Sequence, residues 1–184
     1  MLFATTNSDK IREIGEILRL DLEPIRIELP ELQTIEVRDV IVAKADAAFL
    51  TLGRPCLVED TGLSILAWNG LPGALIKWFL KGVGPDGICK MMRGWPDRRA
   101  LAVTSLGIRI GETTHVFDGS IEGRIALEPR GSNGFGWDSL FEPIGFDRTF
   151  AEMTGEEKNS VSMRAKAAEA FATFLRSDES APSW

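Results

Sequence analysis

The stretch Leu57-Val58-Glu59-Asp60-Thr61-Gly62-Leu63 decides how the rest of this sequence is interpreted. Two apolar residues lead into two acidic ones, and Thr61-Gly62 predicts a turn. An apolar run that ends in a turn is typical of a buried α/β strand, whose carboxyl end is where such sheets bind ligands. Because a strand points neighbouring side chains to opposite faces, Glu59 and Asp60 cannot both face one ion. We expect one carboxylate to be structural and the other to face a site; the alternative is a solvated acidic strand end.

The length and composition indicate one soluble globular domain. The chain has 184 residues, of which 44% are hydrophobic and 26% charged. This is long enough to bury a sizeable core, and no linker or internal repeat divides it. We therefore expect a single domain over residues 1–184, with a frayed polar tail over 177–184.

Charge and cysteine content limit the partners and the compartment. The formal net charge of −6 argues against a surface that binds nucleic-acid polymers by bulk positive charge. Only two cysteines are present, which suits a reduced compartment. No apolar run is long enough to span a membrane, and the amino terminus lacks a signal pattern. We expect a cytoplasmic protein with no membrane or nucleic-acid partner.

A small polar loop near the amino terminus has the features of an anion site. A short strand over residues 2–4 leads into Thr5-Thr6-Asn7-Ser8-Asp9-Lys10, and a helix with an apolar face follows. Ser8 or Asn7 can cap this helix. Free amides and the helix dipole favour phosphate there, and Lys10 adds a positive charge. The alternative is a plain capped loop.

Two further segments precede the acidic stretch. Alternation over residues 25–29 predicts a half-exposed strand, which Pro30 ends and Glu31 follows. Helical periodicity predicts a helix over 37–52, with Lys44 at the edge of its apolar stripe. That lysine either extends to water or meets an anion inside the fold.

The second half of the chain predicts a hairpin, a glycine-rich loop and a final helix. Strand-like runs over 99–110 and 113–125 are joined by Gly111-Glu112, with the lone His115 expected as a cross-strand residue. Glycines in the loop over 128–138 surround Phe135 and Trp137, which predicts an exposed aromatic pair open to a flat ligand.

Taken together and in this order, these motifs resemble the inosine/xanthosine triphosphate pyrophosphatase family. The resemblance covers nearly the whole chain. The matching blocks are Thr5 to Lys10, Leu29-Pro30-Glu31, Val58 to Leu63, Leu71-Pro72-Gly73 with Ile76-Lys77-Trp78-Phe79, Gly134-Phe135-Gly136-Trp137-Asp138, Thr149 to Thr154, and Glu156 to Asn159 with Ser162 to Arg164.

This resemblance implies an α/β fold with an elongated, strongly twisted mixed sheet, flanking helices and two lobes around a central cleft. It implies hydrolysis of non-canonical purine nucleoside triphosphates such as ITP, dITP and XTP to the monophosphate and pyrophosphate. It also implies a homodimer and Mg²⁺ as cofactor.

The resemblance further implies roles for individual residues. Glu31 and Asp60 would hold magnesium, and Asp60 would activate the attacking water, with Lys10 as the second catalytic residue. The substrate would be bound by Thr5, Thr6, Asn7, Ser8, Asp9, Lys10, Lys44 and Thr61 at its phosphates, and by Phe135, Gly136, Trp137, Asp138, Lys158, Met163 and Arg164 at its base.

Two positions depart from the family pattern. Thr6 stands where glycine is usual, so the loop must accept a Cβ. Met163 stands where the family has histidine, which removes an imidazole from the base end. This substitution leaves two alternatives to the expected activity: a nucleotide-binding sensor with little turnover, or a pyrophosphatase with a shifted base preference.

Overall fold

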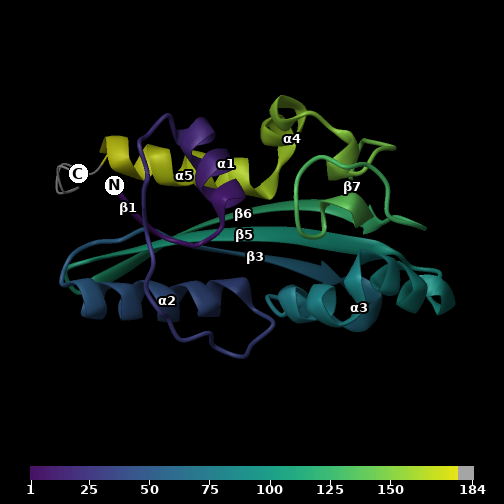
Figure 1. Ribbon diagram of the computed structural model, residues 1–184, viewed down its shortest axis with the longest axis horizontal. Helices are drawn as coiled ribbons and strands as arrows, with labels where there is room; N and C mark the ends of the chain where they lie inside the picture. Colours follow the sequence, from purple (N-terminus) through teal and green to yellow (C-terminus); the bar gives the residue numbers. More distant parts are fainter. Residues whose placement is uncertain (178–184) are drawn as a thin grey trace.

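The computed structural model describes residues 1–177, so the expected tail over 177–184 lies outside the described residues except for Ser177, which ends the last helix. Its centre is a five-stranded antiparallel sheet in the order β4-β3-β5-β6-β7. Figure 1 shows the long strands of this sheet running along the length of the molecule. The strands are β3 (Val58–Ile65), β4 (Pro72–Gly73), β5 (Arg99–Ile110), β6 (Thr113–Ile125) and β7 (Phe141–Pro143).

The hairpin of β5 and β6 forms as the sequence predicts. Residues 111 and 112 make the turn, and Gly111 takes a positive φ of 60°, which a glycine adopts without strain. His115 pairs across the hairpin with Ile108 and packs its ring 4.6 Å from that of Phe174. The prediction of a cross-strand histidine is therefore confirmed.

A small parallel sheet lies beside the long one. It pairs β1 (Leu2–Ala4) with β2 (Glu23–Ile25), and a parallel bridge from Phe3 to Leu57 connects it to the start of β3. The predicted strand over 25–29 is wrong beyond residue 25. β1 offers only three residues for pairing, and the chain after β2 instead runs along a cleft, which Ile27 and Leu29 help to line.

Helices cover both faces of the long sheet (Figure 1). One face carries α2 (Val37–Leu52) and α3 (Ile76–Met91), and the other carries α1 (Ser8–Leu18) and α5 (Met163–Ser177), with α4 (Gly155–Val161) beside the amino end of α5. The bounds of α2 match the predicted helix. The part of the chain that the structure describes also has four short 3₁₀ turns: Leu66–Trp68, Met92–Gly94, Asp138–Leu140 and Phe150–Glu152.

The structure corrects the interpretation of the acidic stretch. Strand β3 does not turn at Thr61-Gly62; it continues to Ile65, so Glu59 and Asp60 lie near its beginning rather than at its carboxyl end. Gly62 is required for packing instead. A Cβ there would lie 2.5 Å from Cγ2 of Val37 and 2.9 Å from the carbonyl carbon of Gly73. The glycine lets α2 and β4 approach the strand closely.

The core forms where helices meet the sheet, and it fixes the elements that carry the polar residues described below. Ile14 of α1 and Phe171 of α5 pack against Leu106 on one face, whereas Ile41 and Val58 pack together on the other. Among residues 1–177, none of the helices combines the length and the hydropathy that a membrane span needs.

Candidate active site

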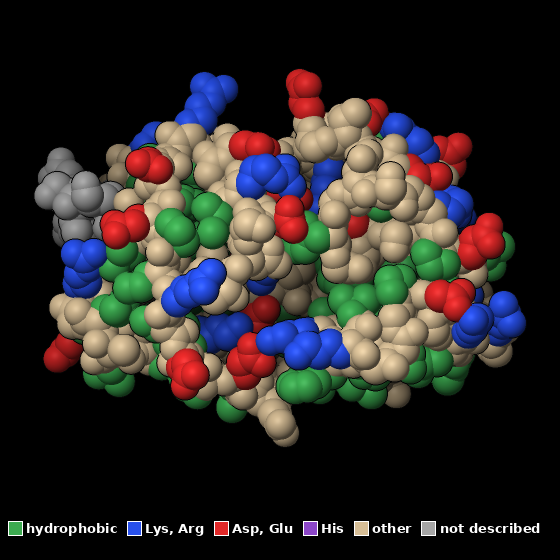
Figure 2. Space-filling view, in the orientation of Figure 1, with side chains coloured by type: hydrophobic (Ala, Val, Ile, Leu, Met, Phe, Trp, Pro, Cys, Tyr) green, Lys and Arg blue, Asp and Glu red, His purple; other side chains and the backbone are tan. Residues whose placement is uncertain are grey.

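A cleft of about 990 Å³ opens between the helices at the middle of the molecule. Figure 2 shows a hollow on this face in which basic and acidic side chains gather. Its lining comes from segments far apart in the chain: 4–10, 25–33, 40–44 of α2, 59–61 of β3, 74–81 at the start of α3, 135–138 and 163–164. The fold therefore brings most of the predicted site residues to one place.

The amino-terminal loop is held in shape by its own side chains. Asn7 is the N-cap of α1, and its Oδ1 accepts hydrogen bonds from the amides of Asp9 (2.9 Å) and Lys10 (3.3 Å). Oγ1 of Thr5 accepts from the Asn7 amide at 3.1 Å. Thr5, Thr6, Asn7 and Lys10 line the cleft, but Ser8 and Asp9 do not. Ser8 is exposed in the first turn of α1, and Asp9 pairs with Arg12 on the surface, so neither has the expected position in the cleft.

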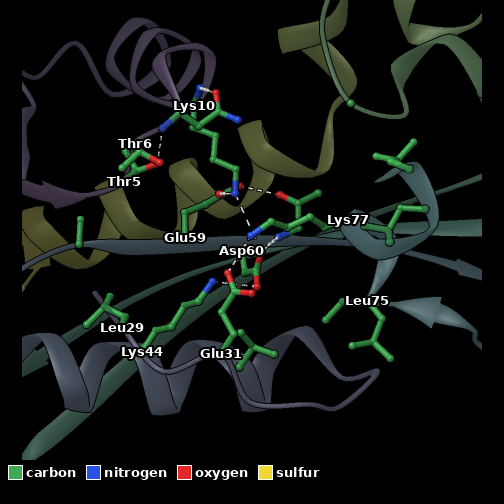
Figure 3. Close-up of a pocket in the computed structure, with 18 of the residues that line it drawn as sticks. Thr5, Thr6, Lys10, Leu29, Glu31, Lys44, Glu59, Asp60, Leu75 and Lys77 are labelled. Carbon is green, nitrogen blue, oxygen red and sulfur yellow. Dashed lines mark hydrogen bonds and ion pairs between the residues drawn. The ribbon is translucent and has the colours of Figure 1, made fainter. Parts of the chain in front are cut away.

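Lys10 reaches from α1 to the two carboxylates of β3 (Figure 3). Its Nζ forms an ion pair with Oε2 of Glu59 and lies 3.9 Å from Oδ1 of Asp60. The expectation that these two acids cannot both face one ion is therefore wrong, because both line the cleft and both meet Lys10. Their burial nevertheless differs, as expected of one structural carboxylate and one that faces a site. Glu59 is buried, whereas Asp60 stays partly exposed to the cleft.

Glu59 joins the two ends of the cleft. Its Oε1 accepts from Nη2 of Arg164 at 3.1 Å and from the hydroxyl of Thr61 at 2.6 Å, while Lys10 pairs with its other oxygen. Burial opposes ionisation of Glu59, but the charges of Lys10 and Arg164 outweigh burial and lower its pKa to about 2. Glu59 is therefore ionised at neutral pH despite its burial.

Lys44 turns into the cleft rather than out to water. Its side chain is 14% exposed, and its Nζ donates to Oδ2 of Asp60 at 3.1 Å. Of the two alternatives that the sequence left open, the structure favours a lysine that meets an anionic group inside the fold. Asp60 thus lies between Lys10 and Lys44 (Figure 3).

Glu31 lines the same cleft from the loop after β2, where Lys77 of α3 donates to its Oε1 at 3.1 Å. The hydrogen bond from Lys77 lowers the pKa of Glu31, and the charges of Lys77 and Lys44 lower it further. Lys77 is not among the site residues predicted from the sequence. One feature of the sequence could have indicated it: Lys77 lies in the first turn of the helix that follows Pro72-Gly73.

The other end of the cleft is a buried ionic cluster. Nζ of Lys158 lies 2.7 Å from Oδ2 of Asp138 and 3.0 Å from Oε1 of Glu13, and Arg164 pairs with the other oxygen of Glu13. Burial raises the pKa of Asp138, and the nearby Lys158 offsets part of that effect. Glu13 was missed in the sequence, although it lies three residues after Lys10 and therefore on the same helix face.

The aromatic pair of the glycine-rich loop divides into two roles, which corrects the expected exposed pair. Trp137 is only 6% exposed and packs edge-on against Phe141 in the core. Phe135 is half-buried in the cleft, with its ring centre 5.1 Å from Nζ of Lys158 and 5.3 Å from the guanidinium carbon of Arg164. Lys158 itself lies behind this ring and is not part of the cleft lining.

Met163 lies at the boundary of the cleft and the core. It belongs to the cleft lining, yet it is 1% exposed and packs in the apolar cluster that contains Trp137 and Phe150. The neighbouring Arg164 points its guanidinium into the ionic cluster instead.

The charges that line the cleft balance formally. Five basic side chains (Lys10, Lys44, Lys77, Lys81 and Arg164) face five acidic ones (Glu28, Glu31, Glu59, Asp60 and Asp138). Among residues 1–177, no group of three or more His, Cys, Asp or Glu side chains could hold a metal by itself. A cation bound between Glu31 and Asp60 would need further oxygen ligands from water or a bound anion, which is how Mg²⁺ is commonly held.

The fold and the cleft define an α/β protein whose cleft has paired lysines and carboxylates at one end and a buried ionic cluster at the other. A sequence model described as the Ham1 family matches residues 1–174. The chain belongs to this family.

Relatives and solved structures agree with that assignment. The chain is 42% identical to the inosine triphosphate pyrophosphatase of Schizosaccharomyces pombe, over 97% of this chain and 96% of the relative. It is 44% identical to that of Yarrowia lipolytica, over 95% of each chain. A HAM1 protein structure from Coxiella burnetii matches with a TM-score of 0.85 and 30% identity, over 96% of this chain and 98% of the other. The predicted fold class and family are confirmed.

We predict that Glu59→Gln lowers the free energy of unfolding at pH 7 by about 3–5 kcal/mol, because it leaves buried cations underpaired. Since the pKa of Glu59 is lowered when the protein folds, its contribution is complete above the unfolded pKa near 4.5 and is lost as the pH falls towards 2. The difference in unfolding free energy between wild type and Glu59→Gln, measured by urea unfolding, should therefore narrow by about 1 kcal/mol as the pH falls from 6 to 3.5. A difference that stays constant over this range would contradict the lowered pKa.

Proposed function

We propose that this protein hydrolyses 6-oxo purine nucleoside triphosphates to the monophosphate and pyrophosphate. The observation that carries the proposal is a single cleft with Lys10, Lys44 and Asp60 at one end and Asp138 with Arg164 at the other. The S. pombe and Y. lipolytica relatives are named as inosine triphosphate pyrophosphatases, and a similar Mycobacterium abscessus structure, 31% identical with a TM-score of 0.73, is titled a dITP/XTP pyrophosphatase.

At the phosphate end, Lys10 and Lys44 would bind the triphosphate oxygens. In the free protein both lysines are paired with Asp60, so the carboxylate holds them close together. In the loop at the amino end of α1, the amides of Thr5 and Asn7 already donate to the carbonyl of Phe3 and to Oγ1 of Thr5, so the amide of Thr6 would be the donor that the loop adds. The helix dipole makes this position favourable for an anion. Lys77 would release Glu31 and contribute a third cation to the same end.

A divalent metal fits this end of the cleft. The cleft carries no formal excess of positive charge, so a triphosphate needs an additional cation. Glu31 and Asp60 would hold that cation, and we propose Mg²⁺ because it prefers few carboxylates together with phosphate and water oxygens. When bound, the metal would neutralise charge that develops on the phosphates.

Asp60 would act as the base. It would take a proton from a water molecule whose oxygen forms a bond to the α-phosphorus, while the bond from that phosphorus to the bridging oxygen breaks. Pyrophosphate leaves, and Lys10 would stabilise the negative charge of the leaving oxygens. The proton then passes from Asp60 to solvent, which restores the free carboxylate.

At the base end, the ring of Phe135 would stack on the purine, a contact worth about 1–3 kcal/mol per base. Gly136 beside it would let the backbone approach the ring closely. Arg164 would donate to a 6-oxo group, and Lys158 would hold Asp138 in place behind it. Adenine presents an amino donor at that position, and a mismatch of buried donors can reject a substrate by about 10⁴ to 10⁵.

The proposal is tested by product analysis. With Mg²⁺ present, inosine triphosphate should yield pyrophosphate and much faster hydrolysis than adenosine triphosphate. Stepwise release of orthophosphate would indicate a different phosphohydrolase. Tight binding without turnover would indicate a nucleotide sensor. That the chain is a cytoplasmic homodimer and a single domain stays a prediction.

Asp60→Asn removes the base but keeps its size, so we predict that turnover of inosine triphosphate falls by more than about a hundredfold while the fold is retained. The control is Asp86→Asn, which removes an exposed carboxylate paired with Lys90 on α3. Steady-state kinetics with both variants make the comparison. Turnover of Asp60→Asn within threefold of wild type would contradict the proposed role.

Lys44→Met should weaken substrate binding by about tenfold to a hundredfold, because a charged hydrogen bond is worth roughly 1.5–3 kcal/mol. Thermal stability should remain equal or rise, since a half-buried charge is replaced by an apolar chain. Lys90→Met, on an exposed face of α3, is the matched control. Unchanged kinetics with lower stability would assign Lys44 a structural role only.

Met163→His tests the departure from the family pattern. Because Met163 packs in the core, we predict that the variant changes the ratio of kcat/KM for inosine and adenosine triphosphates by less than about tenfold, or 1.4 kcal/mol. Arg164→Ala should lower the same ratio far more. A large gain in selectivity from Met163→His alone would mean that this position loosens the base pocket.

A further inference from the structure

We propose that Arg130, which lies outside the cleft, is a positioning residue that fixes the loop carrying Phe135 and Asp138 for base selection. The inference rests on the proposed function, because it concerns the same base end. Arg130 is not one of the residues that line the cleft. It would therefore act through the loop and not by contact with the substrate.

Arg130 connects its own loop to two segments that follow it in the chain, β7 and the turn over residues 147–152. Its Nη2 donates to Oε1 of Glu142 in β7 at 2.7 Å and to the carbonyl of Asp147 at 3.1 Å. Its Nε donates to Oε2 of Glu152 at 3.2 Å. Its carbonyl accepts from the hydroxyl of Thr149 at 2.9 Å. One side chain and its own carbonyl thereby bind the loop to β7 and to the turn over 147–152.

The backbone of Arg130 also closes the loop over residues 130–139, which carries Phe135 and Asp138. The amide of Arg130 donates to the carbonyl of Ser139 at 2.8 Å, so residues 130 and 139 are held together while the segment between them projects to the cleft. Within that segment, the Phe135 amide donates to Oδ2 of Asp138 at 2.8 Å. A shift of residues 130 and 139 would therefore move Phe135 and Asp138, the two groups that would face the purine.

The rest of the loop depends on the turn that Arg130 holds. The amides of Ser132 and Asn133 both donate to the carbonyl of Ala151, at 3.1 and 2.9 Å. Gly131 passes so close to Ala151 that a Cβ would lie 2.3 Å from its backbone. Since Glu152 is next in the chain and is paired with Arg130, the turn and the loop share one anchor.

Arginine chemistry suits this task and lysine does not. A planar guanidinium donates in several fixed directions at once, whereas an ammonium on a flexible stem acts as a point charge. Hydrogen bonding from Arg130 to Glu142 also raises the pKa of Arg130, so the group stays charged. Two separate carboxylates and a carbonyl cannot all be satisfied in this geometry by one lysine.

Arg124 provides a matched control in the same network. It pairs with the other oxygen of Glu142, but its side chain is 61% exposed, and among residues 1–177 it forms no hydrogen bond to the loop. Arg130→Met leaves Glu142 paired with Arg124, and Arg124→Met leaves it paired with Arg130. Glu152 also loses its guanidinium partner in Arg130→Met, but it is 28% exposed and keeps the hydrogen bond from the Thr149 amide, so neither variant leaves a fully buried carboxylate unpaired. The two variants differ in whether the loop loses its anchor.

The experiment compares Arg130→Met, Arg130→Lys and Arg124→Met in the full chain. For both Arg130 variants we expect at least a tenfold loss of inosine monophosphate affinity and of the inosine-to-adenosine ratio of kcat/KM, with pyrophosphate affinity within twofold of wild type. Arg124→Met should match wild type in all three. Equal behaviour of the Arg130 and Arg124 variants, or full rescue by Arg130→Lys, would overturn the positioning role.

A purely structural role would give a different result. It would lower affinity for pyrophosphate and inosine monophosphate together, in step with lower thermal stability, and this outcome too would overturn the proposal. If Arg130→Met does not fold, Arg130→Lys against Arg124→Met carries the comparison. Failure of the wild-type protein to release pyrophosphate would contradict the proposed function separately, because the monophosphate and pyrophosphate affinities are measured without turnover.

Discussion

The structure depends on one buried carboxylate, that of Glu59. An isolated charge of this kind would be costly to bury, and it is tolerated because Lys10 and Arg164 approach it from two sides. Those cations come from α1 and α5, whereas Glu59 belongs to β3. The pairing therefore fixes a helix from each end of the chain against β3, and it sets the distance between the two ends of the cleft.

The same pairing determines what the cleft can bind. Lys10 is shared between Glu59 and Asp60, and Arg164 is shared between Glu59 and Glu13, so each cation is already oriented before a ligand arrives. Preorganised charges of this kind lose little entropy on binding. Their formal balance of charge also explains why a highly charged anion would need to enter with a metal.

Much of this arrangement could be predicted from the sequence, for local reasons. Helix α2 and the hairpin of β5 and β6 follow from periodicity and from the turn at Gly111. The polar loop after β1 could be predicted in the same way, as could the division of Glu59 and Asp60 into a buried and a partly exposed carboxylate, although Lys10 meets both. The wrong predictions concern tertiary packing: Gly62 accommodates Val37 and Gly73 rather than a turn, and Trp137 fills the core.

Other features could not be read from local patterns at all. Glu13, Lys77 and Arg130 matter because of partners that lie 145, 46 and 12 residues away in the chain. A sequence shows that such residues are charged, but not which carboxylate or guanidinium the fold brings to them. Ser8 and Asp9 illustrate the converse, since their neighbours line the cleft and they do not.

The most direct test of the account is the binding of the two products to wild type and to Glu59→Gln. Under the proposed function, inosine monophosphate would report on the end with Arg164, and magnesium pyrophosphate would report on the end with Lys10. If Glu59 organises both ends, calorimetry should find both affinities lowered by at least about tenfold, or 1.4 kcal/mol, in a variant whose circular dichroism is unchanged. Loss of affinity for one product alone, or for neither, would contradict the account.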